Sequence, residues 1–223
     1  MQKVMHLAAA AAFLIAAGTT VHASTDGDAF IRVNGGSSHI KTHELEVRDD
    51  NDRAYGLLAG YRWNTASNLE VGVEAGYTEL GKLSQHESTI GPSVDPFGNL
   101  IGYHSDFTYK AKAALVGATG RWEWAPRWAL VGHAGIARSH ITSAGSAGLT
   151  RNGVPIGGLF ENESHVSSTH NGEYAGVGVG FDVTSHIAVS ANYDHYWLKS
   201  DNWYGGQHNV GIGVWGIAAE FRM

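Results

Sequence analysis

The sequence predicts an all-β protein, an eight-stranded antiparallel up-and-down β-barrel that crosses a membrane. First, apolar residues alternate with small or polar residues at a period of two over eight segments. Second, the apolar face of each segment runs without a charge for about nine to eleven residues, the length of a tilted strand across a bilayer. Third, the opposite face is rich in glycine and charge, unlike a soluble core, so the apolar face is expected to meet lipid.

The first 23 residues predict a cleaved secretory signal peptide. Lys3 gives a basic start, residues 7–17 are apolar and rich in alanine, and Val21-His22-Ala23 fits the small-x-small cleavage rule. The apolar run is too short to span a bilayer as a helix. We therefore expect a signal peptide at residues 1–23 and one barrel domain at residues 24–223.

The composition argues against disulfides, nucleic-acid binding and transmembrane helices. The chain has no cysteine, so disulfides are excluded, and its 30 glycines among 223 residues are nearly twice the usual share of about 7%. The formal net charge of −6 and the lack of a basic stripe argue against nucleic acid as a partner. No later segment approaches about 20 consecutive apolar residues, so no transmembrane helix is expected.

The connections between the eight segments alternate between long and short. The expected strands are residues 29–39, 53–63, 69–80, 105–122, 128–140, 171–183, 187–198 and 208–223. Tight turns are expected at 64–68, 123–127 and 184–186, and long loops at 41–52, 81–104 and 141–170, which are charged or rich in Gly and Ser. Because every backbone group in lipid must be paired, the last strand must pair with the first.

The last strand shows the alternation clearly. Trp215, Ile217 and Phe221 share the apolar face, whereas Glu220 and Arg222 lie on the other. We therefore expect this strand to close the barrel, with its two charged side chains in the lumen.

Charged residues on the inner faces predict a network inside the lumen. Its expected members are Arg32, Arg62, Glu70, Glu74, Lys110, Lys112, His133, Asp194, Glu220 and Arg222. Because an eight-stranded barrel is only wide enough for its own side chains, these groups are expected to pair and fill it. Glu74 with Lys110 or Lys112 is the first candidate pair, and His133 is expected to complete a hydrogen-bond network.

Aromatic residues near the strand ends predict two interfacial girdles. At the short-turn ends these are Trp63, Trp122, Trp124 and Trp128, with Phe221 near the C-terminus, and at the long-loop ends they are Tyr77, Phe107, Tyr109, Tyr193 and Trp197. This arrangement places the short turns in the periplasm and the long loops outside the cell.

With these features the sequence resembles the OmpA transmembrane domain and the OmpX/Ail-type outer-membrane barrels. The motifs that carry the resemblance are Ala59-Gly60-Tyr61-Arg62, Val73-Glu74-Ala75-Gly76-Tyr77, His133-Ala134-Gly135 and Ala191-Asn192-Tyr193. The resemblance implies location in the outer membrane of a Gram-negative envelope, and no cofactor is expected. No peptidoglycan-binding domain follows the last expected strand, so that role of full OmpA is not carried over. It implies outer-membrane lipids and lipopolysaccharide as partners, with periplasmic chaperones and the barrel-assembly machinery during biogenesis. Members usually end on Phe, whereas this sequence ends Phe221-Arg222-Met223.

The favoured function is structural or surface contact, in adhesion or envelope integrity, with the loops meeting a host or surface ligand. One alternative is a lipid A-modifying acyltransferase or deacylase, which needs a Ser, a His and an acid at one interface. Its candidate residues are Ser139, His140, Ser168, His170, Asp194 and His195. Further alternatives are a narrow porin-like ion pore and a soluble lipocalin-like binder.

A metal site at the outer rim is a further possibility, because imidazole suits zinc, copper or nickel. The candidate ligands are His39, His43, His86, His104, His140, His165, His170, His195 and His208. No pair of them has the spacing of a metal motif, so solvated loop histidines are the favoured interpretation and no metal is expected.

Overall fold

The computed structural model describes residues 27–42, 51–94, 97–152, 154–156, 162–201 and 206–223. The expected signal peptide, and Glu44, Glu46, Asp49 and Asp50 of the first expected loop, lie outside the described residues. In the described part of the chain, no helix is long and apolar enough to cross a membrane.

The described residues form one closed β-sheet. Its strands are β1 (Gly27–Thr42), β2 (Asn51–Ala66), β3 (Leu69–Val94), β4 (Leu100–Ala125), β5 (Trp128–Arg151), β6 (Val154–Pro155), β7 (Asn162–Asp182), β8 (Ile187–Asp201) and β9 (Gln207–Arg222). Eight of them pair antiparallel around a ring, and β6 adds a two-residue strand beside β5. The ring closes where β9 pairs with β1, for example Ala219 opposite Val33. The predicted fold class is therefore confirmed.

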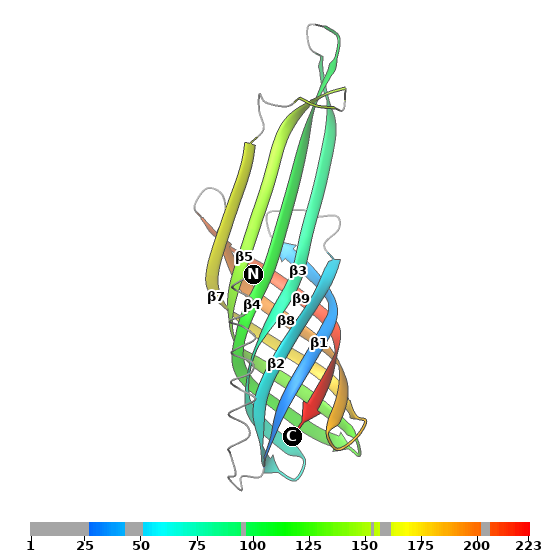
Figure 1. The fold of residues 1–223 in the computed structure, drawn as a ribbon, viewed down its shortest axis with the longest axis vertical. Coiled ribbons are helices and arrows are strands. Elements are labelled where there is room, and N and C mark those ends of the chain that lie inside the picture. The colour runs from blue at the N-terminus through cyan, green and yellow to red at the C-terminus, as the bar shows by residue number, and fades with distance from the viewer. Residues whose placement is uncertain (1–26, 43–50, 95–96, 153, 157–161, 202–205) are drawn as a thin grey trace.

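Tight connections join β2 to β3, β4 to β5 and β7 to β8 at one end of the barrel, called here the short-turn end (Figure 1). The C-terminus lies at the same end (Figure 1). In the β4–β5 turn Arg127 has a positive φ of 70°, and its guanidinium holds the neighbouring β7–β8 turn through the carbonyls of Asp182 and Val183, at 2.8 and 2.6 Å. The β4–β5 and β7–β8 turns are thus tied to each other.

Four strands extend far beyond the ring at the opposite, hairpin end (Figure 1). β3, β4, β5 and β7 have 26, 26, 24 and 21 residues, against 15 or 16 in the other four barrel strands. At about 3.3 Å per residue, ten additional residues add roughly 30 Å. Residues 82–94, 100–110, 142–151 and 162–172 of these strands form what is called here the extended sheet.

The prediction of long loops at 81–104 and 141–170 was therefore largely wrong. Their Gly and Ser content suggested loops, but each segment continues its ladder, with Thr89 opposite Tyr103 and Ser143 opposite Val166. Outside lipid, a strand needs no continuous apolar face, because water can solvate both sides of a polar sheet. Composition alone therefore did not reveal these strands, which are held in place by hydrogen bonding to their neighbours.

The outward face of the ring is an apolar belt. Large apolar side chains that point away from the lumen are strongly exposed, including Val116 at 66% and Ile217 at 73%. A continuous surface of this kind is unfavourable in water and is the expected lipid-facing wall of a membrane barrel.

The lumen is filled by two different kinds of side chain. Toward the short-turn end its residues are charged, with Arg32, Arg62 and Glu74 all nearly inaccessible to solvent. Toward the hairpin end an apolar cluster takes over, of which Leu80 and Ile212 are fully buried members. The barrel thus has a polar lower lumen and an apolar upper lumen.

The predicted faces of β4 were wrong at its hairpin end. Lys110 and Lys112 point outward and are exposed, whereas Tyr109 is buried in the apolar cluster and Phe107 packs against it. The inverted pattern of a membrane barrel holds only where lipid surrounds the wall. Beyond the apolar belt the exterior is polar, so charges face out and apolar groups face in, as in a soluble protein.

Candidate functional site: a charge network across the lumen

Glu220 of β9 is the centre of the buried network. Arg62 donates two hydrogen bonds of 2.7 Å to its two carboxylate oxygens, and Arg32 donates two more to Oε2, at 2.9 and 3.1 Å. The Arg62 guanidinium also lies 4.0 Å from the centre of the Phe30 ring. Charge-assisted, forked contacts of this kind fix both position and orientation.

Glu74 of β3 continues the network toward the middle of the barrel. Its Oε1 accepts a hydrogen bond of 2.9 Å from the Tyr174 hydroxyl and lies 3.2 Å from His133 Nδ1. Arg32 Nη1 is 3.7 Å from the other oxygen. The predicted pairing of Glu74 with Lys110 or Lys112 was therefore wrong, because both lysines point out of the barrel.

Glycines in the wall let the long side chains cross the lumen. Tyr174 on β7 and Glu74 on β3 are separated by Gly135 and Gly117, which are directly opposite each other on β5 and β4. A Cβ at Gly135 would approach the Tyr174 ring to 2.8 Å, and one at Gly117 would approach its hydroxyl to 2.5 Å. The glycine content of the inner face thus provides the space for the network.

His133 of β5 and Asp194 of β8 meet in the same way. Their atoms Nε2 and Oδ1 lie 2.8 Å apart, and the residue between them in the ladder is Gly176 of β7. With Glu74 on Nδ1, both nitrogens of the imidazole ring face carboxylate oxygens. His133 Nδ1 also lies 3.2 Å from Arg32 Nη1, so the ring joins both carboxylates and a guanidinium in one network.

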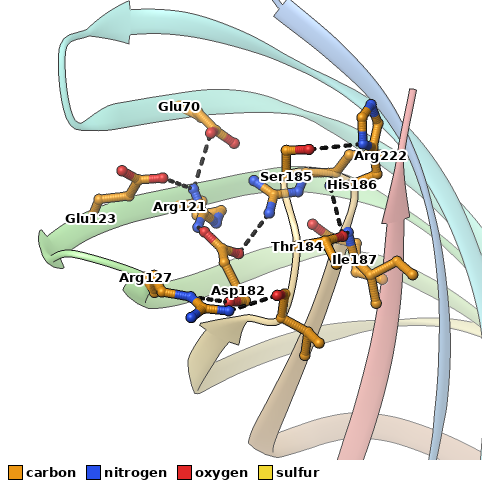
Figure 2. Close-up of polar contacts among 12 residues, drawn as sticks. Glu70, Arg121, Glu123, Arg127, Asp182, Thr184, Ser185, His186, Ile187 and Arg222 are labelled. Carbon is orange, nitrogen blue, oxygen red and sulfur yellow. Dashed lines mark hydrogen bonds and ion pairs between the residues drawn. The ribbon is translucent and has the colours of Figure 1, made fainter.

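A second group of charges occupies the short-turn end of the lumen (Figure 2). Arg121 of β4 contacts Glu70 at 3.1 Å, Asp182 at 2.6 Å and also Glu123, and Asp182 receives a second bond of 2.6 Å from Arg222. Glu70 lies 3.9 Å from Arg62 and so links this group to Glu220. The side chains therefore form one connected network from mid-barrel to the short-turn end.

The structure brings together eight of the ten predicted lumen residues. They are Arg32, Arg62, Glu70, Glu74, His133, Asp194, Glu220 and Arg222, while Lys110 and Lys112 are excluded as described above. Their role as the functional site stays a prediction. When Arg121 of β4 and Tyr174 and Asp182 of β7 are added, each of the eight ring strands contributes at least one member to the network.

Four further members were not predicted: Tyr174, Arg121, Glu123 and Asp182. Asp182 lies on the predicted inner face of its strand, and its position alone could have included it. Arg121 was missed because Tyr109 was predicted to face outward on β4, which places Arg121 on the outward face as well. Taking Trp122 and Trp124 as the outward-facing residues, as the structure has them, would have placed Arg121 in the lumen.

The predicted girdle aromatics divide by face. Those that point outward are Trp63, Tyr77, Trp122, Trp124, Trp128, Tyr193, Trp197 and Phe221. Several pack together, as Trp128 does with Phe181 at 5.0 Å and Tyr193 with Trp215 at 4.5 Å between ring centres. Phe107 and Tyr109 belong to the apolar lumen instead, so their assignment to a girdle was wrong. Contact of the other eight with the interface stays a prediction.

The candidate residues of the enzymatic alternative do not all meet at one place. His170 Nε2 lies 2.9 Å from Asp201 Oδ1, and Ser168 Oγ accepts a hydrogen bond of 3.4 Å from the Asp201 backbone amide. Ser139 is fully buried and donates to the His170 carbonyl, while Asp194 is held by His133 inside the lumen. His140 contacts the hydroxyls of Thr169 and Ser167, at 2.9 and 3.2 Å. In the described ranges, no three His, Asp or Glu side chains are grouped so as to hold a metal ion.

The closed wall, the lipid-facing apolar belt and the filled lumen together define an integral β-barrel membrane protein. The chain belongs to the family of outer membrane protein beta-barrel domains, whose model matches residues 7–216. The protein is accordingly an outer-membrane protein.

Solved structures of similar fold include Ail, the attachment invasion locus protein of Yersinia pestis, with 18% identity, a TM-score of 0.47, and coverage of 89% of this chain and 99% of Ail. Neisserial surface protein A has 10% identity, a TM-score of 0.42, and coverage of 87% and 97%. The outer membrane protease OmpT of Escherichia coli has 10% identity, a TM-score of 0.45, and coverage of 89% and 94%. Likenesses at this level carry no argument about function. No curated protein matches the chain.

Proposed function

We propose that the protein is a non-enzymatic, non-conducting scaffold that holds the extended sheet above the outer membrane for contact with a surface ligand. The observation that carries this proposal is the extension of β3, β4, β5 and β7 beyond the ring. A lumen filled with interlocked side chains supports the anchoring role, because it leaves the wall rigid and the interior without an open path. The signal peptide at residues 1–23 and the outward orientation of the hairpin end belong to the same proposal.

The far end of the extended sheet carries exposed apolar side chains that do not belong to the buried apolar cluster of the lumen. Phe97 is 86% exposed and Val154 is 66% exposed, and Leu100 and Tyr103 on β4 are about half exposed. These four residues are called the tip. Exposed apolar groups at the end of the sheet that lies farthest from the ring favour a contact surface over a purely structural ending.

Asn152 makes this tip rigid. It has a positive φ of 51°, its side-chain oxygen accepts a hydrogen bond of 2.9 Å from the Leu100 amide, and its own amide donates to the Leu100 carbonyl at 2.8 Å. Its side-chain nitrogen donates to Asn99 at 3.0 Å. The β3–β4 turn and the end of β5 are therefore fixed to each other, which lowers the entropic cost of binding a partner.

Shortening the hairpins tests the proposal. Joining Ser84 to Thr108 and Ser143 to Val166 by Asn-Gly turns follows the ladder and leaves the ring intact. Cells of a deletion strain that display the shortened protein are expected to lose adhesion to epithelial cells and survival in serum, but to keep detergent resistance. Wild-type adhesion and serum survival with the shortened protein would overturn the proposal.

A double substitution at the tip tests the contact without shortening the sheet. Phe97→Ser with Leu100→Ser keeps the sheet and removes only apolar surface. Adhesion should fall at least about tenfold if the tip makes the contact, since exposed apolar anchors dominate contact energy. Heat-modifiable gel mobility shows in each case that the barrel has folded.

A further inference from the structure

A pocket opens on the outer wall where the extended sheet leaves the ring. The β2–β3 ladder stops at Tyr55 opposite Glu79, and β3 then continues beside β4 alone. A β-bulge between Glu79 and Lys82 bends the strand there. Gly81 has a φ of +98°, and a Cβ on it would lie 2.7 Å from Ser38 Oγ. The bend thus needs glycine, and it leaves a cavity of about 460 Å³.

Four cations surround this cavity: Arg53, Lys82, Lys110 and Lys112. All four are exposed. Lys82 and Lys110 are directly opposite in the β3–β4 ladder, an arrangement that is unfavourable for like charges. An anion between them would turn this repulsion into attraction.

The two carboxylates of the pocket do not neutralise the lysines. Glu79 is opposite Lys112 in the ladder but accepts its hydrogen bond from the Tyr55 hydroxyl, at 2.5 Å. Asp52 accepts from the backbone amide of Lys82, also at 2.5 Å. Within the described ranges, no carboxylate forms an ion pair with any of the three lysines. Both acids are held by neutral donors, so the ammonium groups stay available to a ligand.

The height of the pocket on the wall indicates the ligand. The last outward-facing members of the apolar belt on these strands are Tyr55, Tyr77 and Ala114, and the cations follow directly beyond them. In the orientation proposed above, this level meets the headgroups of the outer leaflet. Basic side chains just beyond an apolar span are the usual arrangement for recognising anionic headgroups.

We propose that this pocket binds a phosphate group carried by a lipid of the outer leaflet. The lysine ammoniums would contact the phosphate oxygens, Arg53 would add a fork-shaped donor at its edge, and the acyl chains would lie against the apolar belt below. The site is separate from the tip and from the lumen network, so it does not depend on either. It would secure the base of the extended sheet to the membrane surface.

Native mass spectrometry of the full chain in lipid nanodiscs tests the proposal. The probes are bisphosphorylated lipid A and the same lipid with both phosphates removed. We expect the wild type to retain the phosphorylated form at least about tenfold more, with retention falling as salt rises. Equal retention of both forms would overturn the proposal.

A triple variant, Lys82→Gln with Lys110→Gln and Lys112→Gln, should lose that preference. The matched control, Lys199→Gln, removes an exposed cation from the outer wall on β8, away from the pocket, and should keep retention within about twofold. Retention by the triple variant equal to that of the wild type would contradict the assignment. Because all four side chains are exposed, heat-modifiable mobility should be unchanged in both variants.

The source of the phosphate is distinguished with a soluble anion. Inositol hexakisphosphate is titrated against the wild type in nanodiscs of a zwitterionic lipid. Weak displacement of bound lipid A supports a lipid ligand. Tight binding of the soluble anion, lost in the triple variant and without any preference for phosphorylated lipid, would overturn the lipid source.

Discussion

His133 and Asp194 lie 2.8 Å apart across a strand that separates them, because the residue between them is Gly176. The contact shows how the lumen is built: glycines remove side chains from the wall so that charged groups of more distant strands can meet. A soluble barrel would fill the same volume with apolar side chains. Here the apolar face of the wall contacts lipid, and charged side chains from different strands pair with one another in the lumen.

Gly176→Ala should break this contact. The new Cβ would overlap with Asp194 Oδ1 and His133 Nε2, so both side chains must move apart and leave buried polar atoms without partners. We expect a loss of about 2 kcal/mol in the free energy of unfolding, measured by urea titration in lipid vesicles. Gly132→Ala is the control, because its nearest non-neighbouring atom would be 3.9 Å away. Equal effects of the two substitutions would refute the role given to Gly176.

Glu220→Gln should be the most damaging single change in the network. It leaves the guanidinium groups of Arg32 and Arg62 buried without the carboxylate that receives four of their hydrogen bonds. Removing one partner of a buried pair costs about 3–5 kcal/mol, which the same urea titration measures. Glu173→Gln, at an exposed carboxylate on β7, should change stability by less than about 0.5 kcal/mol. A neutral result at Glu220 would show that the network contributes nothing to stability.

Tyr174→Phe should have an intermediate effect. It removes one hydrogen bond to Glu74, which keeps its contacts with His133 and Arg32. A hydrogen bond to a charged group contributes about 1.5–3 kcal/mol. Tyr103→Phe on the extended sheet serves as the control and should be silent. A loss at Tyr174 as large as that of Glu220→Gln would mean that the ring, and not the hydroxyl, matters there.

Planar-bilayer recordings should show no steady conductance for the wild type. The charged lower lumen and the apolar upper lumen close the interior independently. Arg62→Ser with Glu220→Ser removes only the lower closure, so this variant should also stay silent. Conductance in the wild type would favour the pore alternative. Conductance in the double variant alone would show that the apolar cluster does not seal the barrel.

The sequence was sufficient for the fold because lipid imposes a strict alternation. Inward and outward faces were predicted correctly wherever belt residues such as Val73, Ile136 and Ile217 set the period. The prediction failed at Lys110 and Tyr109, because the position where lipid ends cannot be read from alternation alone. It failed again at residues 81–104 and 141–170, where pairing between strands, absent from any local pattern, sustains the hairpins.

The sequence predicted which residues belong to the lumen network better than it predicted which of them contact each other. Glu220 and Arg62 were recognised from the face they share with other charges. The contacts of Glu74 were not recognised, because Tyr174 reaches it across Gly135 and Gly117. These residues lie in one row across four strands, and the row can be identified only when the strand register is known. Register joins residues a hundred positions apart, so no local motif reveals it.

Cysteine labelling along β4 tests the central claim, that the faces of the wall follow lipid in the belt and invert beyond it. The chain has no cysteine, so each substitution reports alone. On intact cells a membrane-impermeant maleimide should label Lys112→Cys and leave Ala113→Cys unmodified, and a spin label at Ala118→Cys should collide with oxygen but not with a water-soluble nickel reagent. Labelling of Ala113→Cys with protection of Lys112→Cys would contradict the account.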